Sequence, residues 1–119
     1  MLKYKNSKKI IGGTEMFNFS INERTIDINE IDELIGEINL IDIREPHEFK
    51  CGTLRTAKNI PMDTLLNNPD KYLDKDKKYY IMCRAGRRSA ITCRELKYKG
   101  FDVVDVTSGM AFYEGNERA

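Results

Sequence analysis

Short apolar runs alternate along the chain with segments of helical spacing, from residue 25 onward. The runs are three to five residues long, and most are built of Ile, Leu, Val, Met and Tyr, which is typical of strands buried in a parallel sheet. They predict strands at residues 25–27, 39–43, 57–60, 78–82 and 102–106. Because helix-like segments separate the runs, the pattern predicts an α/β domain with a mainly parallel five-stranded sheet and helices on both faces.

The helical segments carry recognisable start and stop signals. Helices are predicted at residues 30–35, 45–50, 62–66 and 69–73 (where the spacing allows one or two short helices), 89–99 and 108–114. Asn29 can cap the first, Pro46 suits the opening turn of the second, and Gly100 stops the fifth. Ligands of such sheets bind beyond the carboxyl ends of the strands. That rule directs attention to the residues that follow Met82.

Composition narrows the class of protein. The 119 residues are 33% charged and 40% hydrophobic, which is the balance of one globular domain rather than of a disordered tail. The formal net charge of +1 gives no field that would attract nucleic acid or an anionic membrane, so neither is predicted as a partner. No apolar run approaches the roughly 20 residues that a membrane-spanning helix needs.

The first 24 residues differ from the rest. They are rich in Lys and Asn and show no sustained period, so we expect a flexible or loosely docked arm ahead of a domain over residues 25–119. Only Ile10 and Ile11 follow the basic start, which is not the core of a signal peptide, and we expect a reducing, cytoplasmic location. The Gly12-Gly13 pair is what a purine-rich ribosome-binding sequence would encode, so Met16 is an alternative start.

The segment after Met82 carries the chemistry. Cys83 ends a predicted strand, and a basic loop then leads into a predicted helix. The loop N–H groups, the helix N-terminus and three arginines all favour a thiolate, the nucleophilic form of cysteine. Gly86 supplies a position that can adopt positive φ, as a tight cradle needs. The residues predicted to bind a small anion are Arg84, Ala85, Gly86, Arg87, Arg88 and Ser89. The alternative is a buried cysteine beside a solvated basic face.

This loop resembles the active-site loop of single-domain rhodaneses, and the resemblance extends over residues 25–115. Upstream, Asp42, Arg44, Glu48 and Phe49 are similar to the family's Asp-x-Arg-x-x-x-Glu-Phe stretch. Five further residues fall where its Gly-His-Ile-x-x-Ala-x-Asn-Ile-Pro stretch places them: Gly52, Ala57, Asn59, Ile60 and Pro61. Downstream, the Gly-Phe and Gly-Gly-Met segments are matched by Gly100-Phe101 and Ser108-Gly109-Met110.

The resemblance implies a sulfurtransferase with Cys83 as the catalytic nucleophile. Cys83 would take the outer sulfur of a donor such as thiosulfate as a persulfide and pass it to an acceptor. The implied partners are a small anionic sulfur donor and a thiol or cyanide acceptor, with thioredoxin and sulfur-carrier proteins as candidates, and no cofactor or metal is expected. Asp42 and Arg44 are implied to lie near the pocket, where they brace the loop or form a scaffold ion pair. Glu48 is expected to order local structure.

The chain departs from the family pattern at a few positions. Thr53-Leu54 stands in place of His-Ile, Ser108 in place of the first Gly of the closing pair, and Tyr113 in place of Trp. These changes bear on pocket shape and acceptor preference rather than on the nucleophile.

The remaining candidate side chains are two cysteines and a histidine. Cys93 lies on the sheet-facing side of a predicted helix and is expected to be a buried, inert core residue. Cys51 is expected to be either a spectator or a resolving thiol for the Cys83 persulfide. His47 is expected at the surface.

Two other functions fit a fold of this kind. A phosphatase or arsenate reductase needs a Cys, five intervening residues and then an Arg. Counting from Cys83 puts Ser89 at that position, with the last arginine one residue short at Arg88. A non-enzymatic docking or regulatory module is the second alternative, since fold alone does not imply activity. Such modules usually lack the loop cysteine, so the sequence favours sulfur transfer.

Overall fold

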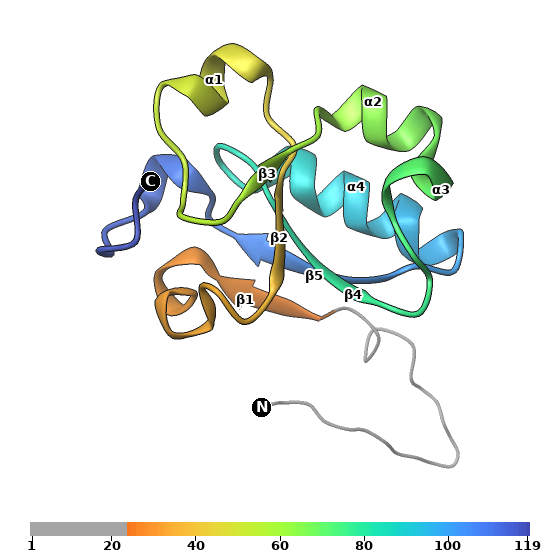
Figure 1. Cartoon of the computed structure of the whole chain (residues 1–119), viewed down its shortest axis with the longest axis horizontal. Helices are drawn as coiled ribbons and strands as arrows, with labels where there is room; N and C mark the ends of the chain where they lie inside the picture. The colour runs from red at the N-terminus through yellow and green to blue at the C-terminus, as the bar shows by residue number, and fades with distance from the viewer. Residues whose placement is uncertain (1–23) are drawn as a thin grey trace.

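Five parallel strands form a single sheet in the order β1-β5-β4-β2-β3 (Figure 1). The computed structural model describes residues 24–119, so the predicted arm, apart from Arg24, and the alternative start Met16 lie outside the described residues. The strands are β1 (Thr25–Asp27), β2 (Asn39–Asp42), β3 (Lys58–Asn59), β4 (Lys78–Met82) and β5 (Asp102–Thr107). This arrangement confirms the predicted five-stranded α/β sheet.

Four α-helices connect the strands. They are α1 (Pro46–Lys50), α2 (Met62–Asn67), α3 (Pro69–Tyr72) and α4 (Arg87–Tyr98). One face of the sheet packs against α2 and α4 through a core that includes Leu65, Leu96 and Val103, each fully buried. Because side chains of a strand alternate between faces, Ile81 joins this core while the adjacent Met82 joins the core of the other face.

Short 3-10 helices cover that other face: η4 (Ile28–Glu30), η5 (Asp32–Leu34) and η6 (Met110–Phe112). The helices predicted over residues 30–35 and 108–114 are therefore short 3-10 helices with different bounds, and two of them stand in place of the first. Asp27, not Asn29, caps the first turn, because its carboxylate accepts a hydrogen bond from the Asn29 N–H. A 3-10 helix aligns residues i and i+3, and this spacing buries both Ile28 and Ile31 completely.

The register of two central strands creates the candidate site. β2 and β4 are neighbours, and Asp42 at the carboxyl end of β2 is aligned with Met82 at the end of β4. The chain after β2 therefore lies beside the loop that begins at Cys83, and α1 follows beyond this edge (Figure 1). Helix α4 begins at Arg87, two residues earlier than predicted, because Gly86 takes the N-cap position with φ +90°.

Among residues 24–119, no helix combines the length and the apolar content that a membrane crossing requires.

Candidate active site

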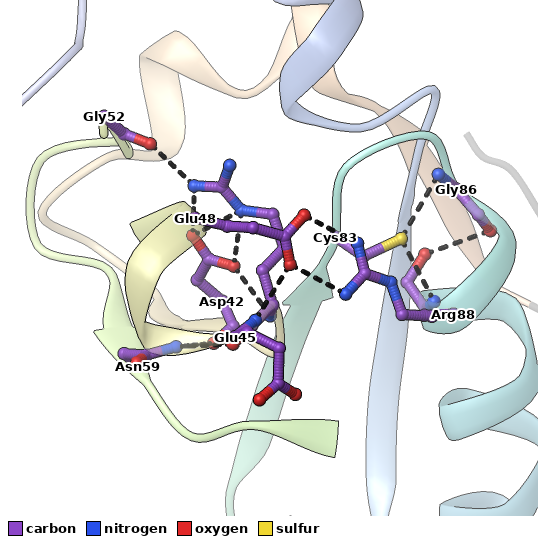
Figure 2. A network of polar contacts seen from close by, with 10 residues as sticks. Asp42, Glu45, Glu48, Gly52, Asn59, Cys83, Gly86 and Arg88 are labelled. Atoms are coloured by element: carbon purple, nitrogen blue, oxygen red, sulfur yellow. Dashed lines mark hydrogen bonds and ion pairs between the residues drawn. The ribbon is translucent and has the colours of Figure 1, made fainter. Parts of the chain in front are cut away.

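Cys83 sits at the bottom of a small cradle of backbone donors. Its Sγ accepts hydrogen bonds from the N–H groups of Gly86 at 3.2 Å and Ser89 at 3.3 Å (Figure 2). The Ser89 N–H belongs to the first turn of α4, where backbone donors have no partner within the helix. Cys83 itself is only 1% exposed. Two amide dipoles thus point at a sulfur that is withdrawn from water, as hydrogen-bond donors for an anionic sulfur would.

The turn after β5 holds the opposite side of the loop. Met110 N–H donates to the Cys83 carbonyl and Ala111 N–H to the Arg84 carbonyl, both at 2.8 Å. Gly109, with φ +80°, makes this approach possible, because a Cβ there would lie 2.5 Å from the Arg84 carbonyl carbon. Sequence analysis missed these contacts, although the Gly109-Met110 pair in the resemblance marked the segment that makes them.

Ser108 occupies the position where the family pattern has Gly. It adopts φ +72°, which is unfavourable for a residue with a side chain. Its hydroxyl donates to Asp27 Oδ2 at 2.7 Å and so ties the turn to β1. The pKa of Asp27 is lowered, first by the bond from the Asn29 N–H and then by that from Ser108. The side-chain bond stabilises the left-handed backbone that glycine would adopt without strain.

The three arginines of the loop have different environments. Arg84 and Arg87 are exposed, and neither side chain forms an ion pair or hydrogen bond with any of residues 24–119. Arg88 instead donates two hydrogen bonds to the Glu48 carboxylate, at 2.9 and 3.0 Å (Figure 2). This ion pair lowers the pKa of Glu48 to about 2 and raises that of Arg88. Within the part of the chain that the structure describes, two of the predicted anion-binding arginines therefore have no polar side-chain partner, and the third is paired with Glu48 of α1.

Asp42 and Arg44 form a buried ion pair at the carboxyl end of β2. The Asp42 side chain is inaccessible to solvent, and Arg44 is 6% exposed. Arg44 donates through Nε and Nη2 to the Asp42 carboxylate, and Nη2 also donates to the Gly52 carbonyl at 2.6 Å. Thr53 Oγ1 donates to the same carboxylate at 2.8 Å. These contacts are those of a scaffold ion pair that joins β2 to the segment after α1.

The two other cysteines and the histidine differ in their exposure to solvent. Cys93 is 3% exposed, as predicted, and burial raises its pKa to about 12, with a further contribution from the charge of Asp105. Cys51 is exposed at the end of α1, and His47 is exposed within it. Residues 24–119 contain no group of three His, Cys, Asp or Glu side chains placed to hold a metal ion.

Comparison with known proteins adds an independent line of evidence. Residues 27–115 match the family model described as a rhodanese-like domain. The chain is 38% identical to a Bacillus subtilis (strain 168) protein named "Putative sulfurtransferase YtwF", over 79% of this chain and 90% of that protein. It is 30% identical to the "Putative sulfur carrier protein YrkF" of the same strain, over 66% of this chain and 42% of that protein.

A solved structure is similar in both sequence and fold. The crystal structure of a rhodanese-like domain protein from Staphylococcus aureus superimposes with a TM-score of 0.71 at 31% identity. The match covers 81% of this chain and 96% of the other.

Proposed function

The chain belongs to the rhodanese-like family, and from that membership we propose that it is a sulfurtransferase. It moves sulfane sulfur from thiosulfate or a related persulfide donor to a thiophilic acceptor, through a persulfide on Cys83. The observation that carries the proposal is the pair of backbone N–H groups that converge on Cys83 Sγ. Such donors stabilise the thiolate that attacks and the anionic persulfide that results.

The reaction proceeds in two displacements at sulfur. In the first, the Cys83 thiolate attacks the outer sulfur of thiosulfate, a new S–S bond forms, the S–S bond of the donor breaks and sulfite leaves with the electron pair. In the second, a thiolate or cyanide attacks the outer sulfur of the persulfide, and Cys83 is released as the thiolate. Each step conserves charge, and neither requires a cofactor.

The two exposed arginines suit the first displacement. Arg84 and Arg87 are exposed on the loop that carries Cys83, where they attract a dianionic donor. In this proposal the sulfur donor is a small anion, and the sulfur acceptor is a thiol or cyanide. Thioredoxin and sulfur-carrier proteins are candidate acceptors in this proposal.

The geometry does not favour phosphoryl or arsenate chemistry. Those reactions require an arginine that clamps a tetrahedral oxyanion at the mouth of the cradle. The last loop arginine, Arg88, is turned to Glu48 by two hydrogen bonds, and Ser89 occupies the position one residue further on. The backbone donors at Gly86 and Ser89 already reach the Cys83 sulfur itself.

Intact-protein mass and steady-state turnover test the proposal. Thiosulfate should add the mass of one sulfur atom to the native protein, and Cys83→Ser should abolish both this adduct and transfer to cyanide. Cys93→Ala is the matched control, because it also removes a buried thiol, and it should keep both. Sulfur transfer that survives in Cys83→Ser, or an adduct mapped to Cys51 or Cys93, would refute the mechanism. A folded wild-type protein inactive with every donor would instead support a docking module.

A further inference from the structure

Charged side chains alternate in sign from the buried end of β2 to the candidate nucleophile. Asp42 pairs with Arg44 at 2.8 Å, and Glu48 pairs with Arg88 at 2.9 Å. Between the pairs, the positive charge of Arg44 contributes to the lowered pKa of Glu48. Beyond them, the charge of Cys83 contributes to the raised pKa of Arg88. The guanidinium of Arg88 is therefore electrostatically coupled to both the Glu48 carboxylate and the sulfur.

The Glu48 carboxylate holds this guanidinium in one orientation. Its two oxygens accept one hydrogen bond each from the two terminal nitrogens of Arg88, and Oε1 also accepts from the Glu45 N–H at 3.0 Å. The Glu48 side chain is 19% exposed and that of Arg88 33%. A bidentate pair anchored at a helix start fixes the plane of the guanidinium as well as its position.

Helix α4 needs such a partner at its N-terminus. Arg87 and Arg88 open the helix, where the macrodipole disfavours cations, and its first turn contains no acidic residue. Figure 2 shows Arg88 extending from α4 to the Glu48 carboxylate of α1. Glu48 thus supplies from another helix the negative charge that the first turn of α4 lacks.

We propose that Glu48 is a positioning residue for Cys83: it fixes the guanidinium of Arg88, the residue that lies between the Gly86 and Ser89 donors to the sulfur, and this fixed cation favours the thiolate. The proposal rests on the proposed function in one respect, that Cys83 acts as a thiolate. It also removes Arg88 from the group of donor-binding residues and leaves that role to Arg84 and Arg87, which are unpaired among residues 24–119.

Several other charged or titratable groups belong to the elements around Cys83 and must be considered in any test that uses pH. The loop contributes Arg84 and Arg87, and β2 contributes Asp42, whose charge also acts on Arg88. From α4, Cys93 interacts with Cys83, but its pKa of about 12 keeps it uncharged at neutral pH. At a fixed neutral pH, the Glu48 and Arg88 variants therefore differ from the native protein only in the charges of these two side chains.

A double-mutant cycle on the alkylation rate of Cys83 tests the proposal. Iodoacetamide is neutral, so it reports the fraction of thiolate rather than attraction of an anionic donor, and mass spectrometry of the Cys83 peptide separates it from Cys51. Arg88→Gln should slow alkylation at neutral pH by about tenfold, the effect of losing one nearby opposite charge. In a Glu48→Ala background the same change should slow it by less than about threefold, since Arg88 is no longer held there.

Equal effects of Arg88→Gln in the two backgrounds would overturn the inference, because Arg88 would then act without Glu48. An unchanged alkylation rate in Arg88→Gln, together with a raised thiosulfate KM, would also overturn it and would return Arg88 to donor binding. Should the alanine variant not fold, Glu48→Gln completes the cycle with the same expected sign.

Arg55→Gln is the matched control. It breaks an ion pair of similar length, Arg55–Glu117 at 2.8 Å, that joins other parts of the chain, and it should leave Cys83 alkylation unchanged. An equal slowing in this control would attribute the effect to lost stability and would overturn the inference. Alkylation uses no sulfur donor, so a failed cycle in a protein that still transfers sulfur refutes the role of Glu48 alone.

Discussion

Replacing Gly109 with alanine tests whether the turn after β5 sets the position of the active-site loop. Gly109 is buried and has φ +80°, and a Cβ there would lie 2.5 Å from the Arg84 carbonyl carbon and 2.7 Å from the Ala85 nitrogen. Both are backbone atoms, so no flexible side chain can move aside. Gly36→Ala is the matched control, because Gly36 has φ +93° and a Cβ there would meet nothing within 4 Å.

Both variants carry the cost of a left-handed backbone, but only Gly109→Ala adds the cost of a steric clash. A left-handed backbone costs an alanine about 1–2 kcal/mol at either position. At Gly109 the clash with the loop adds roughly 1–3 kcal/mol, typical of overpacking in a well-packed region. We therefore expect Gly109→Ala to unfold at a lower temperature than Gly36→Ala, by about 4–8 °C for each extra kcal/mol in a domain of this size.

Activity should separate the variants more sharply than stability. Relief of the clash requires the Arg84 carbonyl to recede by about 1 Å, and a misplacement of that size can reduce a reaction rate by about 100-fold. The assay is thiosulfate-dependent sulfur transfer per folded molecule, alongside thermal unfolding followed by circular dichroism. If Gly109→Ala matched Gly36→Ala in both measurements, the turn would not position the loop and this reasoning would be wrong.

Three further predictions follow from individual side chains. The pKa of Glu48 lies at about 2 instead of 4.5, so its ion pair contributes stability above about pH 4.5 that is lost as the pH falls toward 2. Urea unfolding across this range should show the free energy of unfolding fall by about 1–3 kcal/mol, and Arg88→Gln should make this fall smaller. Burial raises the pKa of Cys93 to about 12, so iodoacetamide at neutral pH should modify the exposed Cys51 and spare Cys93 until the protein is unfolded; native labelling of Cys93 would contradict this. Thr53→Val removes the hydroxyl that donates to buried Asp42 and should lower the free energy of unfolding by about 1–3 kcal/mol, while Thr53→Ser should retain most of it.

Local sequence signals were sufficient for the strands and for the candidate nucleophile. The predicted strands at residues 25–27 and 78–82 coincide with β1 and β4. The signal is clearest in β4, because a strand in the middle of a sheet is covered on both faces and needs a nearly continuous apolar run. Cys83 could be singled out because strand, cysteine, glycine-containing loop and helix follow one another within a few residues. Helix type was less predictable, since short segments such as η4 and η6 gain their stability from burial against the sheet rather than from propensity.

The sequence by itself determined the α/β order, the position of Cys83 at the end of a strand and the cradle that Gly86 and Ser89 form around it, since all of these depend on residues close along the chain. Only the tertiary structure decided how the cradle is held. Glu48 and Arg88 are 40 residues apart, and the turn at Gly109 reaches the loop from β5. These contacts exist because β2, β4 and β5 are neighbours in one sheet, and strand order depends on how the whole core packs. A linear pattern could therefore identify the three loop arginines, but only the packed sheet could distinguish the paired Arg88 from the two exposed ones.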